Sequence, residues 1–171
     1  MPQVLVCPLS LVPATVASSG ARHLVTLIND STPVPRPAPI TAENHLFLGV
    51  NDIIEPAEGL VAPALEHVQE LVDFVRRWDQ AHPLVVHCFA GISRSTAAAF
   101  IALCAVNPAR TEADIAQRLR AASPTATPNS RIVGFGDEIL GRGGRMVTAI
   151  QAIGRGTMAV EGMPFGIPIQ D

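Results

Sequence analysis

Lysine and tyrosine are both missing from this chain of 171 residues, and all twelve basic side chains are arginine. Without lysine, neither Schiff-base chemistry nor a lysine-bearing loop for nucleoside triphosphates is available. Without tyrosine, a catalytic phenol is excluded as well. The three cysteines are too few, and odd in number, for a disulfide framework, and this favours a reducing compartment.

Charged residues and long apolar runs are also scarce. Only 16% of the residues are charged and the net charge is −3, which argues against a nucleic-acid partner. The apolar N-terminal stretch has no basic residue before Arg22 and is interrupted by Pro2, Pro8 and Pro13, unlike a signal peptide. The longest apolar run elsewhere, 97–106, has about half the length of a membrane span. We therefore expect a cytoplasmic protein without a membrane partner, and the arginine-rich, lysine-free composition suggests a bacterial one.

The most informative segment is His87–Ser95, with the sequence HCFAGISRS, because it follows an apolar strand and enters a helix. The first N–H groups of a helix lack internal partners and favour negative charge. This place favours the thiolate of Cys88, and Arg94 adds a planar fork that matches two phosphate oxygens. The segment thus predicts a loop that holds a phosphate beside a cysteine nucleophile. In their apolar surroundings, Cys7 and Cys104 are interpreted as small buried residues.

This segment resembles the HCxxGxxRS signature of cysteine-dependent protein tyrosine phosphatases, especially the dual-specificity type. The resemblance implies hydrolysis of a phosphomonoester through a phosphocysteine at Cys88, with Arg94 holding phosphoryl oxygens. It also implies that Ser95 helps Cys88 to leave and that His87 braces the loop. No cofactor is implied, and no metal either, since the histidines form no close pair at ligand spacing. The residues expected to bind the substrate are Phe89, Ala90, Gly91, Ile92, Ser93 and Arg94.

A general acid is expected on the loop after the third predicted strand. Asp52 lies 36 residues before Cys88, which resembles the spacing of the aspartate that protonates the leaving group in the family. Asp52 could instead cap a turn, and Glu55 and Glu58 on the same loop are alternative acids. The segment that begins with Pro128 and Asn129 is similar to a Pro-Asn-x-Gly-Phe motif of dual-specificity phosphatases. It differs by three extra residues before the Gly-Phe pair. The similarity implies that Asn129 supports the phosphate loop, and a helix N-cap is a compatible alternative.

The variable positions of the loop are uncharged, unlike the lysine-bearing loops of inositol lipid phosphatases. We expect phosphotyrosine as the main substrate, with phosphoserine and phosphothreonine also admitted if the pocket is shallow. The partner would be a phosphorylated protein or a small phosphomonoester. Phe89 and Ile92 either line the mouth or pack in the core. Two other functions stay open: a rhodanese-like sulfurtransferase, which also places a cysteine before a helix, and a phosphate-binding module without turnover.

The apolar patterns predict an α/β fold with a small, mostly parallel central sheet flanked by helices, as in dual-specificity phosphatases. We expect one phosphatase-like domain over 1–153 and a C-terminal tail over 154–171, which either docks in an extended form or stays loose. Strands are predicted at 3–6, 23–28, 45–50 and 83–86, and helices at 63–78, 96–106, 111–122, 129–140 and 145–153.

Overall fold

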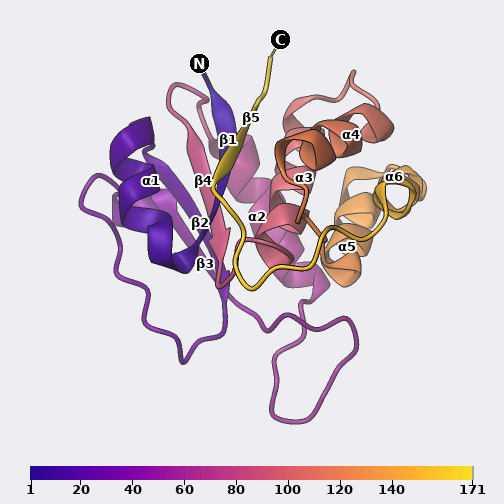
Figure 1. Cartoon of the computed structure of the whole chain (residues 1–171), viewed down its shortest axis with the longest axis horizontal. Coiled ribbons are helices and arrows are strands. Elements are labelled where there is room, and N and C mark those ends of the chain that lie inside the picture. The colour runs from indigo at the N-terminus through magenta and orange to yellow at the C-terminus, as the bar shows by residue number, and fades with distance from the viewer. Residues whose placement is uncertain (171) are drawn as a thin grey trace.

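The computed structural model describes residues 1–170, in which a five-stranded sheet lies between helices (Figure 1). The strand order is β3-β2-β4-β1-β5, and all neighbours are parallel except β1 and β5. This confirms the expected α/β fold with a mostly parallel sheet. The strands are β1 (Gln3–Pro8), β2 (His23–Ile28), β3 (His45–Gly49), β4 (Leu84–Cys88) and β5 (Phe165–Pro168).

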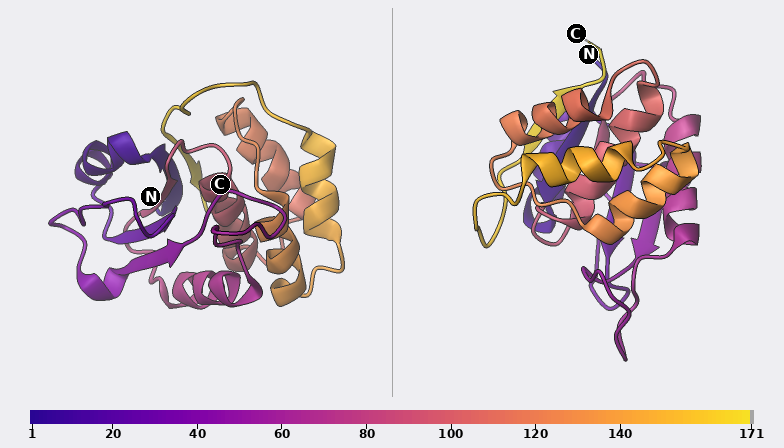
Figure 2. Two further views of the ribbon diagram at one scale, coloured as in Figure 1. Left: turned by 90° about the horizontal axis from the view of Figure 1, so that it is seen from below. Right: turned by 90° about the vertical axis from the view of Figure 1, so that its right-hand side faces the viewer.

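Helices cover both faces of the sheet, as Figures 1 and 2 show. One face is covered by α1 (Val12–Ser19), which packs on a small cluster that includes Leu24 and Val85. The larger core lies on the other face. Its helices are α2 (Leu65–Arg77), α3 (Arg94–Val106), α4 (Glu112–Ala122), α5 (Ser130–Leu140) and α6 (Arg145–Ile153).

The elements on either side of the cysteine loop are the most deeply buried of the fold. Every residue of β4 is buried, as expected for a central strand whose two faces are both covered by helices. In α3, the eleven residues from Arg94 to Cys104 are all buried, and four of them are alanines, whose small side chains allow neighbours to approach closely. The loop between β4 and α3 is therefore held between two rigid elements.

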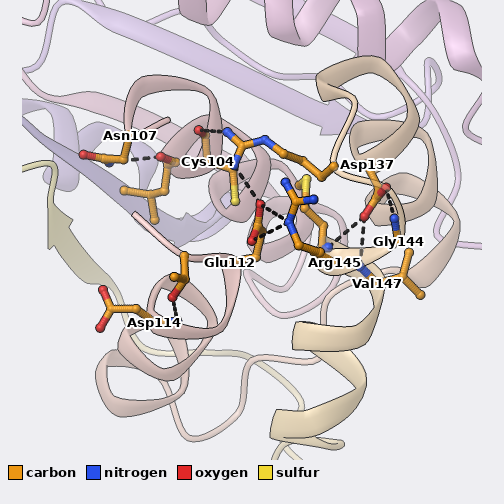
Figure 3. Close-up of polar contacts among 12 residues, drawn as sticks. Cys104, Asn107, Glu112, Asp114, Asp137, Gly144, Arg145 and Val147 are labelled. Carbon is orange, nitrogen blue, oxygen red and sulfur yellow. Dashed lines mark hydrogen bonds and ion pairs between the residues drawn. The ribbon is translucent and has the colours of Figure 1, made fainter. Parts of the chain in front are cut away.

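A polar cluster ties the three C-terminal helices together away from this loop (Figure 3). Glu112 of α4 accepts hydrogen bonds from Arg142 at 2.7 Å and from Arg145 at 3.3 and 3.4 Å. Burial acts to raise the pKa of Glu112, but hydrogen bonds from the backbone and from both arginines outweigh it, so the pKa is lowered. Asp137 of α5 caps the start of α6 by accepting from the N–H groups of Gly144 and Met146, each at 2.7 Å.

Two elements, α1 and β5, were not predicted from the sequence. Helix α1 carries Pro13 in its first turn, where proline is tolerated. The tail after α6 docks in the extended form and contributes β5, which pairs with β1 at the sheet edge. In Figure 1 this yellow segment crosses the molecule from α6 to β5. No helix of residues 1–170 has the length and hydropathy to cross a bilayer.

Candidate active site

The loop after β4 turns sharply because Gly91 adopts a positive φ of 71°. A Cβ at this position would lie 2.8 Å from the Pro8 nitrogen and 2.9 Å from the Cys7 carbonyl carbon, both on the neighbouring strand β1. A side chain at position 91 is thus excluded twice, by the backbone angle and by the contact with β1. The parallel register pairs Pro8 with Cys88 and Cys7 with His87, which brings β1 beside the loop.

The sulfur of Cys88 lies inside this turn and is surrounded by donors. Its Sγ is 3.3 Å from the backbone nitrogen of Gly91, which donates to it, and 3.1 Å from the Ser95 Oγ. Cys88 is only 2% exposed. The Gly91 contact favours a negative charge on sulfur, because a thiolate accepts hydrogen bonds more strongly than a thiol does, and the Ser95 hydroxyl can either donate or accept.

Arg94 begins α3 at the end of the same loop. Its Nη1 donates to the carbonyl oxygen of Val50 at 2.9 Å, which fixes the plane of the group. The side chain is buried, and its Nε has no hydrogen-bond partner within residues 1–170. A buried unpaired N–H costs free energy, so this nitrogen is suited to an anion that enters the loop.

The carbonyl groups of the loop are bonded outward, away from Cys88. The Leu9 N–H donates to the Phe89 carbonyl at 3.1 Å, and the Thr127 N–H donates to the Ile92 carbonyl at 2.9 Å. Because the C=O and N–H of a trans peptide point in opposite directions, outward carbonyls leave the following N–H groups directed inward. Phe89 itself is 60% exposed and Ile92 is half-buried, so Phe89 does not pack in the core.

His87 braces the loop through a buried chain of hydrogen bonds. Its Nδ1 lies 3.1 Å from the Cys88 carbonyl oxygen, and its Nε2 lies 2.7 Å from the Oγ1 of Thr26, which is 2.8 Å from the Nε2 of His45. A carbonyl only accepts, so Nδ1 carries the proton and the Thr26 hydroxyl donates to Nε2. Burial lowers the pKa of His87 to about 4, so this imidazole is neutral near pH 7.

Asp52 lies at the rim, on the loop between β3 and α2. Its Oδ1 accepts from the Ser93 hydroxyl at 2.7 Å and from the Asn129 Nδ2 at 3.0 Å. Ser93 belongs to the cysteine loop, so these contacts place the carboxylate directly beside it. Glu55 and Glu58 are exposed on the same loop.

Asn129 joins three parts of the site. Its Nδ2 also donates to the Ile53 carbonyl at 3.2 Å, and its backbone N–H donates to the Ser93 carbonyl at 3.2 Å. Its Oδ1 accepts from the Ile132 N–H at 3.0 Å, so it is also the N-cap of α5. The N-cap interpretation is therefore seen directly, whereas the side-chain amide contacts the Asp52 loop and only the backbone N–H contacts the cysteine loop.

A cavity of about 820 Å³ opens on the Asp52 side of the loop. Its lining includes Asp52, Ser93 and Asn129, while Cys88 lies next to it and not on its wall. Apolar side chains from Ile53, Ile54 and Ile150 and the basic side chain of Arg155 complete much of the remaining wall. Within residues 1–170, no group of three or more acidic, histidine or cysteine side chains could hold a metal ion.

The other two cysteines are free and fully buried. Burial raises the pKa of Cys7 to about 11 and that of Cys104 to about 12. They are small core residues, as expected from their apolar surroundings.

Comparison with known proteins gives a family match that includes the cysteine loop. The family model for protein-tyrosine phosphatase matches residues 58–124, a range that contains Cys88 and Arg94 but not Asp52 or Asn129. Among curated proteins, no sequence matches this chain.

Several solved structures share the fold. The structure of DUSP15 superimposes with a TM-score of 0.64 at 20% identity, covering 89% of this chain and 92% of that one. Human DUSP28 gives 0.61 at 17% identity, with 81% and 94% covered. The PTP-2 phosphatase of Cydia pomonella also gives 0.61 at 17% identity, with 79% and 84% covered.

The chain thus has an α/β fold that it shares with solved phosphatase structures. Within it, residues 58–124 match the protein-tyrosine phosphatase family, and the chain shares its fold with solved dual-specificity phosphatases.

Sequence reasoning missed some residues that support the site. Thr26 and His45 were not singled out, although a threonine inside an apolar strand signals a buried polar partner. The contacts from the C-terminal tail were missed as well, because no local pattern there indicates where the tail docks.

Proposed function

We propose that this phosphatase hydrolyses phosphomonoesters through a covalent phosphocysteine, with phosphotyrosine as its main substrate. The observation that carries the proposal is the pairing of two features of one loop. The Cys88 sulfur accepts from the Gly91 N–H, and the buried Nε of Arg94 has no acceptor among residues 1–170. The same loop thus carries a nucleophilic sulfur and a guanidinium nitrogen that is available to bind a phosphate oxygen.

In the first step, Cys88 Sγ attacks phosphorus, an S–P bond forms and the P–O bond to the leaving group breaks. Asp52 delivers a proton to the leaving oxygen. Arg94 and the inward N–H groups hold the three other phosphoryl oxygens and offset their charge, which is the main way that proteins assist phosphoryl transfer.

In the second step, water attacks phosphorus while Asp52 takes its proton, and the S–P bond breaks to release inorganic phosphate. The Ser95 hydroxyl, 3.1 Å from Sγ, donates to the departing thiolate. Asp52 thus serves as acid and then as base, which its contact with Ser93 beside the loop supports.

Three observations support an aryl phosphate as the substrate. Phe89 is exposed on the cysteine loop, the wall of the adjacent cavity includes three isoleucines, and no lysine or arginine occupies positions 89–93. The three free, buried cysteines support action in a reducing compartment such as the cytoplasm.

The test is to trap the intermediate. We expect rapid acid quenching during turnover of an aryl phosphate to yield a phosphorylated peptide that contains Cys88, detected by mass spectrometry. Cys88→Ser should abolish turnover but retain binding of inorganic phosphate, since Arg94 and the backbone donors remain. Phosphate release by Cys88→Ser at the wild-type rate would overturn the mechanism, and sulfur transfer from thiosulfate would favour the rhodanese-like alternative.

A further inference from the structure

The tail after α6 forms a strap, residues 154–164, that lies against the outside of the cysteine loop before it enters β5. The strap is fixed at several points along its path. The Arg120 side chain donates to the Gly154 carbonyl at 2.8 Å, and the Gly156 N–H donates to the Thr127 Oγ1 at 3.1 Å. Near its other end, Ser10 Oγ donates to Glu161 Oε1 at 3.0 Å.

The decisive contact is made by Gly162, the one buried residue of the strap. Its backbone N–H donates to the Ala90 carbonyl at 2.8 Å. A Cβ on Gly162 would lie 3.0 Å from the Gly91 carbonyl oxygen and 3.4 Å from the Ile92 side chain. The strap backbone therefore approaches the loop more closely than a residue with a side chain allows without a shift.

The accepting peptide is the same one that contacts the nucleophile. The Ala90 carbonyl and the Gly91 N–H belong to one planar unit, and that N–H donates to Cys88 Sγ at 3.3 Å. The hydrogen bond from Gly162 fixes the tilt of this plane, and it also polarises the peptide so that its N–H becomes a better donor. One peptide unit thus connects the strap to the sulfur.

We propose that Gly162 is a positioning residue for the nucleophile, because its N–H holds the 90–91 peptide in the orientation that stabilises the Cys88 thiolate. The inference rests on the proposed function, since it concerns the same sulfur. It assigns a role to the tail, which lies outside both the family match and the HCxxGxxRS loop.

The experiment must distinguish the effect of the Gly162 hydrogen bond from the effects of other charged groups near the sulfur. The titratable or charged neighbours are Arg94 from α3, Asp52 from the loop after β3, Cys7 from β1 and His87 from β4. The strap itself brings one acidic side chain close to this end of the sheet, that of Glu161. Glu161→Gln removes this charge and keeps an oxygen that can accept from Ser10, so it serves as the charge control.

The experiment measures alkylation of Cys88 by iodoacetamide between pH 5 and 9, with the modified peptide identified by mass spectrometry. Gly162→Pro removes the donating N–H, and Val160→Pro is the matched control at a side chain that is 97% exposed. At pH 6 we expect Gly162→Pro to be alkylated about threefold to tenfold more slowly than the wild type, as the loss of one hydrogen bond predicts. Val160→Pro and Glu161→Gln should not be slowed.

A second variant guards against misfolding. Gly162→Ala keeps the N–H but pushes against the Gly91 carbonyl, and we expect a smaller slowing in the same direction. Folding is checked by the thermal midpoint and by circular dichroism. If Gly162→Pro and Gly162→Ala fold and follow the wild-type pH profile, the inference is wrong. If the wild-type sulfur itself reacts at pH 6 like an ordinary thiol, the proposed function fails instead.

Discussion

The Asn129 side chain donates to Asp52 Oδ1 at 3.0 Å, and this contact links residues that are 77 positions apart. It connects the start of α5 with the loop that carries the candidate acid. The same oxygen also accepts from Ser93, so the carboxylate is held from two sides. The position of Asp52 therefore depends on a residue that does not itself contact Cys88.

Replacing Asn129 by serine separates its two roles. Serine keeps an oxygen that caps α5, so we expect the stability to change by less than about 1 kcal/mol. The shorter side chain cannot reach Asp52, and we expect turnover of phosphotyrosine to fall by about tenfold because the acid is no longer held in place. Steady-state kinetics with thermal unfolding as the control test this, and unchanged turnover would contradict the positioning role.

Replacing Asp52 by alanine should reveal the acid through the leaving group. Hydrolysis of phosphotyrosine should fall by about 10² to 10⁴, the usual contribution of a positioned acid. Esters of more acidic phenols should be affected less, because their leaving oxygen needs no proton. The controls are Glu55→Gln and Glu58→Gln, which should keep nearly the wild-type rate. A large loss in either control, with Asp52→Ala unchanged, would move the acid to that residue.

The neutral, buried His87 makes the fold sensitive to acid. Its pKa in the folded protein is about 4, below the ordinary value of 6.5. Below pH 6.5 the His87 imidazole of the unfolded chain therefore binds a proton, whereas that of the folded protein stays neutral until about pH 4. The free energy of unfolding should be fully retained above about pH 6.5 and fall by about 3 kcal/mol on acidification to pH 4.

Burial also lowers the pKa of His23 and His45, which adds to the loss in the same direction. Chemical denaturation at a series of pH values measures the effect, and an NMR titration of the five imidazoles assigns it. An imidazole of His87 that titrates near pH 6.5 would contradict the prediction.

Mild oxidation should act at one sulfur only. Thiolates react with peroxide, and the pKa values of Cys7 and Cys104, raised by burial to about 11 and 12, keep these two protonated at neutral pH. We expect hydrogen peroxide at pH 7 to inactivate the enzyme through Cys88, with activity restored by dithiothreitol after short exposure. Peptide mapping that finds oxidation first at Cys7 or Cys104 in the folded protein would contradict this.

Local patterns were sufficient to predict the parts of the site that lie close together in the chain. The order of strand, loop and helix around Cys88 was predicted because an apolar run, a glycine and helix-forming residues follow one another there. Helix α1 was not predicted, although Pro13 lies at its start, a position that favours proline.

Contacts between distant segments were harder to predict. The hydrogen bonds of Asn129 to Asp52 and of Gly162 to Ala90 depend on how the loop after β3 and the tail fold back, and no spacing within either segment reveals this. Likewise, Thr26 and His87 meet because the parallel register of β2 and β4 places them opposite each other. Such a register is set by the packing of the whole sheet.

The close fit of Gly91 against Pro8 and Cys7 has a consequence for protein engineering. If the nine residues His87–Ser95 were transplanted between a strand and a helix of another protein, they would carry every chemically active group of this loop. They would lack the adjacent strand that shapes the bend of the loop. Successful transfer of the activity would therefore require at least the two neighbouring parallel strands as a unit, with their alignment preserved.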